Sequence, residues 1–299
     1  MFALLHRRGT LGLALLLLAS LSCSTGSPGG ASRVRPVFIF AGQSNMAGAD
    51  SVIPDPPGFV ATEADRRTLF TGAPLPDGAR SADFYPWGEL KGHRCTNPRY
   101  GEKLVQGPEV GFARQLHAGG VRDIAIIKVW ANFSREARQW PWAEGGELNR
   151  SWLAFVDQRL EELRQQGFEP RVSGFVWHQG IDDAIHGKLA AQYQQNLAGL
   201  IAYLRQRYHA ENAPFVLARS GNSPIARGIT GGGASDPMAV VRQAQVHTGE
   251  TIPNAAWINV DDLPNVVQHH FSAQSQLVIG QRFGEAYLRL AHSATGKNH

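Results

Sequence analysis

The sequence has few cysteines and no strong excess of charge of either sign, and each shortage excludes a class of protein. Two cysteines in 299 residues are too few for a disulfide-stapled fold or a four-cysteine zinc site. Twenty-nine basic and 25 acidic side chains give a net charge of +4, which is too balanced for a nucleic-acid-binding protein that relies on phosphate contacts. A hydrophobic content of 43% excludes intrinsic disorder. The length suits one large globular domain or two small ones.

The N-terminus carries an apolar run, residues 11–21, that follows Arg7 and Arg8. This order is typical of a secretory signal peptide, which we expect at residues 1–23. The run is shorter than the roughly 20 residues that a membrane span needs. Cleavage would remove both arginines and no acidic residue, leaving 27 basic against 25 acidic side chains and a net charge of +2.

The residues around Cys23 resemble a bacterial lipoprotein cleavage box, which predicts a lipid anchor at Cys23. Ordinary cleavage near Ser22 or Ser24, with release of the protein, is the alternative. Either way we expect an exported protein that is periplasmic, secreted or lipid-anchored at the cell envelope of a bacterium. Residues 24–36 are rich in Ser, Gly and Pro and predict a flexible linker, followed by one domain over residues 37–292.

Short apolar runs alternate with helical periodicity through the rest of the chain. The predicted strands are 37–40, 124–130, 172–177, 215–218 and 256–260, and the predicted helices are 109–117, 152–163, 189–208, 236–248 and 272–290. This alternation predicts an α/β fold, a three-layer α/β/α sandwich around a central parallel sheet. Residues 50–108, which hold eight of the 17 prolines, predict a long functional loop or insertion and not a separate domain.

In such sheets ligands bind where the strands end, and the first predicted strand ends in the segment GQSNMAG at residues 42–48. A serine placed there beside a glycine can expose its hydroxyl as a nucleophile and lend its own N–H to an oxyanion. Alternatively Ser44 caps a helix, the commoner fate of a serine after a strand.

Three further segments carry groups that suit the same chemistry, although each also has an ordinary structural explanation. Gly107 precedes a predicted helix and can lend its N–H to an anion. Gln179 follows a predicted strand, and its side-chain amide can stabilise an oxyanion. His269 and His270 are adjacent. The sequence has no H-E-x-x-H motif and no Cys or His set with ligand spacing, so we expect neither a metal nor a cofactor.

Together these segments resemble the SGNH-type esterases of the sialate O-acetylesterase and acetylxylan esterase group, the sixth carbohydrate esterase family. The resemblance covers roughly residues 34–290, and its order and spacing are more specific than any single motif. It implies a flavodoxin-like SGNH hydrolase fold. The matches are GQSNMAG at 42–48, GPEVGFA at 107–113, WHQGIDDA at 177–184, Arg242 with Gln245, and HFSAQSQLVIGQRFGEA at 270–286.

The resemblance implies a role for each matching residue. Ser44 would be the nucleophile and His270 its general base. The N–H groups of Ser44 and Gly107 and the amide of Gln179 would bind the oxyanion. The substrate would be an acetylated carbohydrate, such as an acetylated xylan-type glycan or a sialic acid, cleaved through an acetyl-serine intermediate. We also expect the side chains of Asn45, His178 and Trp140 to contact that sugar, although Trp140 lies outside the matching segments.

Three positions depart from the family pattern. The family acid lies three residues before the histidine, where this chain has Val267. We therefore expect Asp261 or Asp262 to orient His270, or else a Ser–His dyad. Ile181 stands where the family has a glutamate, and Asn132-Phe133 stands where the family often has Gly-Gly after the second strand. These changes leave open a non-catalytic carbohydrate-binding relative. An SGNH-type lipase or thioesterase is the other alternative, which an apolar channel in the 50–106 segment would favour.

Tryptophans near the strand ends are candidates for stacking on a sugar ring. Trp140 and Trp142 flank Pro141, so we expect them to be exposed. Trp177 lies within a predicted strand, so we expect it to be buried.

Overall fold

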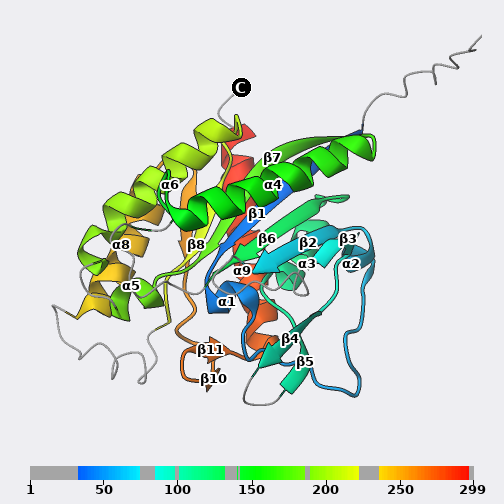
Figure 1. Cartoon of the computed structure of the whole chain (residues 1–299), viewed down its shortest axis with the longest axis horizontal. Coiled ribbons are helices and arrows are strands. Elements are labelled where there is room, and N and C mark those ends of the chain that lie inside the picture. The colour runs from blue at the N-terminus through cyan, green and yellow to red at the C-terminus, as the bar shows by residue number, and fades with distance from the viewer. Residues whose placement is uncertain are drawn as a thin grey trace, which may run out of the picture. The chain divides into compact units, whose positions relative to one another are not determined.

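A seven-stranded sheet organises the part of the chain that the computed structural model describes (Figure 1). That part comprises residues 33–74, 85–97, 101–131, 140, 142–185, 189–221 and 236–295. The strands are, in sheet order, β3 (Tyr85–Glu89), β2 (Leu69–Pro74), β6 (Ala125–Trp130), β1 (Arg33–Gly42), β7 (Phe168–His178), β8 (Phe215–Ala218) and β9 (Ala255–Ile258). Neighbouring strands are parallel throughout, except for the antiparallel pair of β2 and β3.

Helices cover both faces of this sheet. One face packs against α4, α6 and α8, and the other packs against α3 and α9 (Figure 1). The helices are α1 (Ser44–Ala47), α2 (Glu63–Arg66), α3 (Glu109–Ala118), α4 (Glu147–Gln165), α5 (Ile181–Ile185), α6 (Tyr193–Arg207), α8 (Pro237–Thr251) and α9 (Ala273–Thr295), with a 3₁₀ turn η2 (Ala190–Gln192). The predicted three-layer α/β/α architecture is therefore confirmed.

The position of β1 in the middle of the sheet, with helices on both faces, explains why its apolar run is continuous. Val37 and Ile39 belong to the core cluster with α4 and α6, whereas Phe38 and Phe40 belong to the cluster with α3 and α9. Because successive side chains of a strand point to opposite faces, a strand covered on both sides needs apolar residues at every position. All four are essentially inaccessible to solvent.

The structure corrects two predictions about parts of the chain. The segment 50–108, predicted as a loop or insertion, is not a loop, because it contains α2, β2, β3 and two further strands, β4 (His93–Asn97) and β5 (Gly101–Val105), which pair as a hairpin. The strand β2 is six residues long with an internal glycine and a terminal proline, so its sequence shows little of the usual strand pattern. The strand β1 begins at Arg33, so the last residues of the predicted linker belong to the sheet. Residues 1–32, including Cys23, and residues Asn132 and Phe133 lie outside the described residues.

The end of the sheet that carries α1 also carries two hairpins (Figure 1). One is β4–β5, and the other consists of β10 (Asn265–Val267) and β11 (His270–Phe271). This end holds the carboxyl ends of β1, β7, β8 and β9, where ligands bind in sheets of this kind. Within the described residues, no helix is both long and apolar enough to cross a membrane.

Candidate active site

Ser44 is the first residue of α1, directly after the central strand. The preceding residue, Gln43, does not cap the helix with its side chain. Its Oε1 instead accepts hydrogen bonds from the N–H groups of Gly180 at 2.8 Å and Ile181 at 3.1 Å. Gly42 allows the close approach of β7, because a Cβ there would lie 2.3 Å from the His178 carbonyl oxygen. The turn that holds Ser44 is thus tied to the end of β7.

His270 lies between Ser44 and an acid that the sequence did not suggest. Its Nε2 is 2.9 Å from Oγ of Ser44, and its Nδ1 is 2.6 Å from Oδ2 of Asp50. The His270 side chain is 16% exposed and that of Asp50 is 5% exposed. Solvent therefore reaches the imidazole, while the carboxylate is shielded from water and its attraction to the imidazole is strengthened. This is the geometry of a Ser–His–Asp triad.

Asp50 comes from the same turn as the nucleophile, six positions further along the chain. Gly48 ends α1 with φ +84°, and Asp50 itself has φ +60°. This left-handed conformation is sterically unfavourable for most residues but is tolerated better by aspartate. The N–H of Ser51 donates to the Gly48 carbonyl oxygen at 3.1 Å, so residues 48–51 form a tight turn that carries Asp50.

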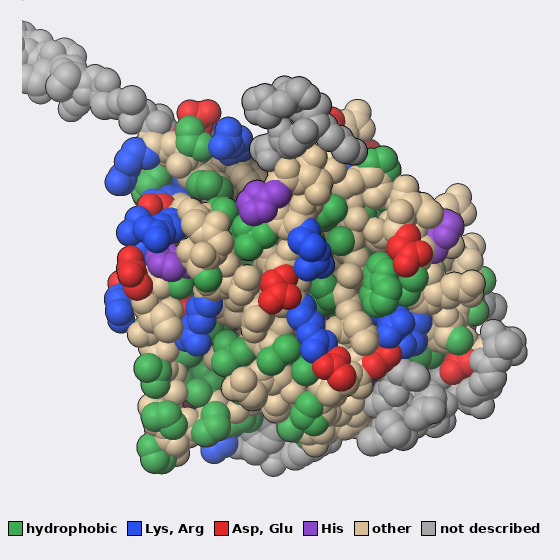
Figure 2. Space-filling view, turned by 180° about the vertical axis from the view of Figure 1, so that it is seen from behind, with side chains coloured by type: hydrophobic (Ala, Val, Ile, Leu, Met, Phe, Trp, Pro, Cys, Tyr) green, Lys and Arg blue, Asp and Glu red, His purple; other side chains and the backbone are tan. Residues whose placement is uncertain are grey.

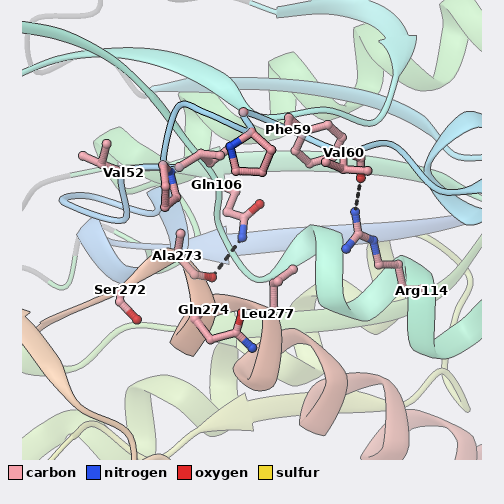
Figure 3. Close-up of a pocket in the computed structure, with 13 residues that line it drawn as sticks. Val52, Phe59, Val60, Gln106, Arg114, Ser272, Ala273, Gln274 and Leu277 are labelled. Atoms are coloured by element: carbon pink, nitrogen blue, oxygen red, sulfur yellow. Dashed lines mark hydrogen bonds between the residues drawn. The ribbon is translucent and has the colours of Figure 1, made fainter.

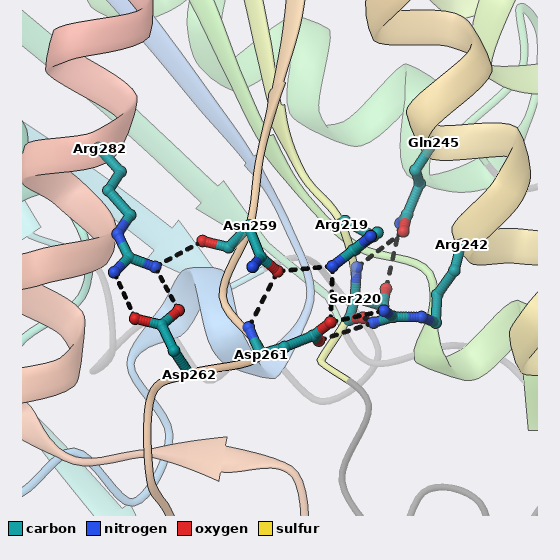
Figure 4. Close-up of polar contacts among 8 residues, drawn as sticks. All are labelled: Arg219, Ser220, Arg242, Gln245, Asn259, Asp261, Asp262 and Arg282. Atoms are coloured by element: carbon teal, nitrogen blue, oxygen red, sulfur yellow. Dashed lines mark hydrogen bonds and ion pairs between the residues drawn. The ribbon is translucent and has the colours of Figure 1, made fainter.

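The prediction that Asp261 or Asp262 orients His270 is wrong, because both carboxylates face arginines (Figure 4). Asp262 pairs with Arg282 through two contacts of 2.7 and 2.6 Å, which lower the pKa of its carboxyl to about 2. Asp261 contacts Arg242 through both carboxylate oxygens, at 2.9 and 2.7 Å, and it also pairs with Arg219. These ion pairs hold the turn from which the chain enters the β10–β11 hairpin.

Asn45 anchors the histidine loop to the nucleophile turn. Its side-chain Nδ2 donates to the backbone carbonyl oxygen of His269 at 3.1 Å. Its backbone carbonyl oxygen accepts from Nε2 of Gln276 at 3.0 Å. Asn45 is only 2% exposed. The predicted contact of Asn45 with the sugar therefore gives way to an internal role in which it fixes the distance between Ser44 and His270.

His178 and Trp140, the other predicted sugar contacts, are also buried. The ring of His178 lies against those of Phe271 and Phe283, and burial, helped by nearby His269, lowers its pKa to about 3. Trp140 is 3% exposed and packs against Trp177. The expected exposure of Trp140 and Trp142 is wrong, because Trp142 is fully inaccessible and both join the core beside Trp177, whose burial was predicted.

His269 stacks edge to face on His270, with ring centroids 4.5 Å apart. Burial, and then the neighbouring His270, lowers the pKa of His269 to about 4. His269 is therefore neutral near pH 7 and adds no competing positive charge beside His270.

Two of the predicted oxyanion donors, the N–H of Gly107 and the side-chain amide of Gln179, donate to acidic side chains. The N–H of Gly107 donates to Oε1 of Glu109 at 3.1 Å, and this single hydrogen is not available to an oxyanion in the observed arrangement. Nε2 of Gln179 donates to the carboxylate of Asp183, although an amide nitrogen carries a second hydrogen. Ser44 is at the first position of α1, where an N–H has no partner within the helix.

Tyr193 and Gln245 form a buried polar cluster that bonds to the backbone of Gln179. The carbonyl oxygen of Gln179 accepts from the hydroxyl of Tyr193 and from Nε2 of Gln245, each at 2.8 Å. Asp183 is fully buried, and burial raises its pKa to about 7. Gln245, which matches the family pattern together with Arg242, thus has an internal role, because it bonds the Gln179 carbonyl oxygen.

A cavity of about 500 Å³ is lined by residues from the segments that follow Asp50 and His270 in the chain (Figure 3). Its wall includes Val52 and Phe59 from the segment after Asp50, and Ser272 and Leu277 from the segment after His270. Gln106 closes one side, where its Nε2 donates to the Ala273 carbonyl oxygen at 2.9 Å. The cavity lies within the size range of small-ligand pockets, and it is lined mainly by apolar residues.

A family model described as "Carbohydrate esterase, sialic acid-specific acetylesterase" matches residues 34–289. The chain is 25% identical over 259 residues to a probable carbohydrate esterase of Arabidopsis thaliana, which covers 84% of this chain and 90% of that protein.

Three solved structures share the fold. A protein from Arabidopsis thaliana has a TM-score of 0.59 at 21% identity and covers 86% of this chain and 98% of its own. NanS has a TM-score of 0.58 at 16% identity, and the match covers 88% of this chain and 99% of NanS. A carbohydrate acetylesterase from Xanthomonas citri has a TM-score of 0.57 at 18% identity and covers 86% and 57%.

Proposed function

The chain belongs to the carbohydrate esterase family of sialic acid-specific acetylesterases and is a carboxylic ester hydrolase; on this premise we propose that it removes O-acetyl groups from carbohydrates through Ser44. The observation that carries the proposal is the position of His270, which contacts both Ser44 and Asp50. A non-catalytic binding protein would have no need of this arrangement. The intact contacts therefore favour an enzyme over a carbohydrate-binding relative.

The first half-reaction forms an acetyl-enzyme. Oγ of Ser44 attacks the acetyl carbonyl carbon while Nε2 of His270 takes its proton. The bond from the carbonyl carbon to the sugar oxygen then breaks, and His270 returns the proton to that oxygen. Asp50 accepts the Nδ1–H of His270, which selects the reactive tautomer and stabilises the imidazolium that forms.

The second half-reaction regenerates the free serine. A water molecule gives a proton to Nε2 of His270 and attacks the carbonyl carbon of the acetyl-serine. The bond to Oγ breaks, Ser44 regains its proton from His270, and the product leaves as acetic acid, which ionises to acetate in water. No step needs a metal or a cofactor.

The negative oxygen of each tetrahedral intermediate needs hydrogen-bond donors. The N–H of Ser44 and the second amide hydrogen of Gln179 are our candidates. Each such donor typically contributes about 3 kcal/mol to lowering the barrier. Gly107 joins them only if its N–H leaves Glu109 when substrate binds.

The test is acetate release from a panel of acetylated glycans. We expect the wild-type protein to release acetate from acetylated xylan or acetylated sialic acid, and also to hydrolyse p-nitrophenyl acetate. Ser44→Ala should abolish each activity while keeping the fold. Equal inactivity of wild type and Ser44→Ala on all three substrates would refute the esterase proposal. The glycan that gives the highest kcat/KM identifies the substrate class.

The near-balance of 29 basic and 25 acidic side chains does not restrict the substrate to one sign of charge. Acidic and basic side chains are interspersed over the face in Figure 2. We therefore place neutral acetylated glycans and acidic sialic acids in the same panel.

A second candidate is an SGNH-type esterase for longer acyl groups, such as a lipase or thioesterase, and the mainly apolar cavity whose wall includes Val52 and Phe59 favours it (Figure 3). A series of p-nitrophenyl esters separates the two functions. An acetylesterase should lose kcat/KM steadily from acetate to octanoate, whereas a lipase should gain. In the second case Phe59→Ala, which changes the cavity wall, should alter the chain-length optimum.

We also propose that the protein is exported and that Cys23 carries a lipid. The support is the layout of residues 1–23. Expression of wild type and Cys23→Ala in a bacterial host tests it by fractionation. Membrane attachment that is lost in Cys23→Ala supports the anchor, whereas release of both proteins supports ordinary cleavage.

A further inference from the structure

Two oppositely charged side chains are fully buried beneath the candidate site. Lys128 lies in β6 and Glu109 begins α3, both are 0% exposed, and Nζ lies 2.8 Å from Oε1. Withdrawing two charges from water is costly, and such a pair often stabilises a fold no better than apolar residues of similar size. The groups that the pair contacts suggest what else it does.

The pair holds one peptide group from one side. Oε1 of Glu109 accepts the N–H of Gly107 at 3.1 Å. The carbonyl of the same peptide group, that of Gln106, accepts from the hydroxyl of Ser51 on the opposite side. Ser51 is fully buried and directly follows Asp50. The 106–107 peptide is therefore clamped between the Glu109 carboxylate and the segment that carries the candidate acid.

The same peptide is packed against the turn that holds Ser44. A Cβ on Gly48 would lie 2.4 Å from the Gln106 carbonyl oxygen, and one on Gly107 would lie 2.7 Å from the Met46 carbonyl oxygen. The two segments thus meet main chain to main chain. Nζ of Lys128 adds a contact of 3.4 Å to the Ala47 carbonyl oxygen. A small shift of the 106–107 peptide would therefore move the 46–51 turn.

The imidazole of His93 lies beside the Lys128–Glu109 pair but carries no charge that would replace that of Lys128. Nδ1 of His93 lies 3.9 Å from Oε1 of Glu109. Burial, and then the charge of Lys128, holds the pKa of His93 well below its usual range. His93 is therefore neutral near pH 7, and Lys128 is the cation that balances Glu109.

We propose that Lys128 and Glu109 form a positioning pair that holds Asp50 in register with His270 by clamping the 106–107 peptide. The inference rests on the proposed function, because it assigns the pair a part in ester hydrolysis. Glu109 supplies the acceptor for the Gly107 N–H, and Lys128 holds the same oxygen from within the core. Neither residue touches the substrate.

Two double variants of similar volume separate positioning from stability. The first, Glu109→Gln with Lys128→Met (the Gln variant), removes both charges but keeps an oxygen acceptor for the N–H of Gly107. The second, Glu109→Leu with Lys128→Met (the Leu variant), removes that acceptor too. We expect both to fold with similar melting temperatures. The Gln variant should keep most of the wild-type kcat on p-nitrophenyl acetate, and the Leu variant should lose about 100-fold in kcat with little change in KM, as expected for a displaced catalytic group.

Asp50→Asn shows whether the pair acts through the acid. In that background the Gln and Leu variants should have equal kcat, because the group being positioned has already lost its function. A proton NMR signal adds a readout without turnover. The downfield Nδ1–H resonance of His270 should persist in wild type and the Gln variant and disappear in the Leu variant.

The outcomes distinguish two failures. A wild type that hydrolyses no acetyl ester refutes the proposed function, and the inference falls with it. An active wild type, with Gln and Leu variants of equal kcat or with losses that multiply with that of Asp50→Asn, refutes the positioning pair alone.

Discussion

Oδ2 of Asp50 lies 2.6 Å from Nδ1 of His270, although the two residues are 220 positions apart in the chain. The acid thus comes from the turn that carries Ser44, whereas the family pattern places it three residues before the histidine. That position is Val267, which pairs with His270 across the β10–β11 hairpin. We infer that Asp50 supplies the function that an acid at position 267 would otherwise provide.

Asp50→Asn should lower kcat on p-nitrophenyl acetate by about 10⁴-fold, because an amide facing His270 favours the wrong imidazole tautomer. Asp262→Asn is the matched control. Its carboxylate is 54% exposed and pairs with Arg282, so its removal should leave kcat near the wild-type value. Equal losses in the two variants would contradict the assignment of Asp50.

Asn45→Ala should lower kcat by roughly 10-fold to 100-fold and leave KM nearly unchanged. The variant loses the bond that holds the His269 carbonyl, so His270 is displaced from Ser44 and the chemical step suffers more than binding. Steady-state kinetics on an acetylated sugar measure both constants. A large rise in KM at constant kcat would show that Asn45 binds the sugar after all.

His178→Phe should make the protein more resistant to acid. The pKa of His178 is lowered to about 3, whereas an unfolded histidine titrates near 6.5. Between these values the unfolded chain binds a proton that the folded protein does not, so stability is complete above about pH 6.5 and is lost as the pH falls toward 3. Phenylalanine suits the contacts with Phe271 and Phe283 and removes this proton uptake.

Urea unfolding between pH 3 and 7 measures the effect of His178→Phe. The free energy of unfolding should fall less steeply with acid in the variant, by at most about 1.4 kcal/mol per pH unit. His247→Gln, at an exposed position of α8, is the control and should follow the wild type. Parallel curves for wild type and His178→Phe would contradict the burial argument.

Asp183→Asn should stabilise the protein at alkaline pH. Burial raises the pKa of Asp183 to about 7, so its favourable contribution is complete below the unfolded pKa near 3.9 and is lost as the pH rises through about 7. Asparagine keeps an oxygen for the amide of Gln179 but cannot ionise. The variant should gain over wild type as the pH rises from 4 to 8, by on the order of 4 kcal/mol at most. A constant difference across this range would show that Asp183 does not titrate in the folded protein.

The architecture was predictable because it depends on local patterns. The buried strand at residues 37–40 and the helical periodicity from residue 189 onward report burial directly through their apolar side chains. The strand β2 lacks such a pattern, because its glycine and proline interrupt it. Its place in the sheet depends on parallel pairing with β6, which no local signal encodes.

The site was predictable only in part, for a related reason. Ser44 and His270 lie in motifs, whereas Asp50 reaches His270 from a turn in which both Gly48 and Asp50 are left-handed. Asp261 and Asp262 are nearer to His270 in the chain, but Arg242 and Arg282 bind them. Closeness in sequence was therefore misleading. An acid just after the nucleophile turn was the available signal, once Val267 had removed the usual candidate.

The most direct test of the account is to trap the acetyl-enzyme. Wild-type protein mixed with an acetylated sugar and quenched in acid within the first turnover should carry one acetyl group on the peptide that contains Ser44. Mass spectrometry of the digest locates the modification, and Ser44→Ala should show none. An active wild-type enzyme with no acetyl group on Ser44, or with an acetyl group on another residue, would contradict the proposed mechanism.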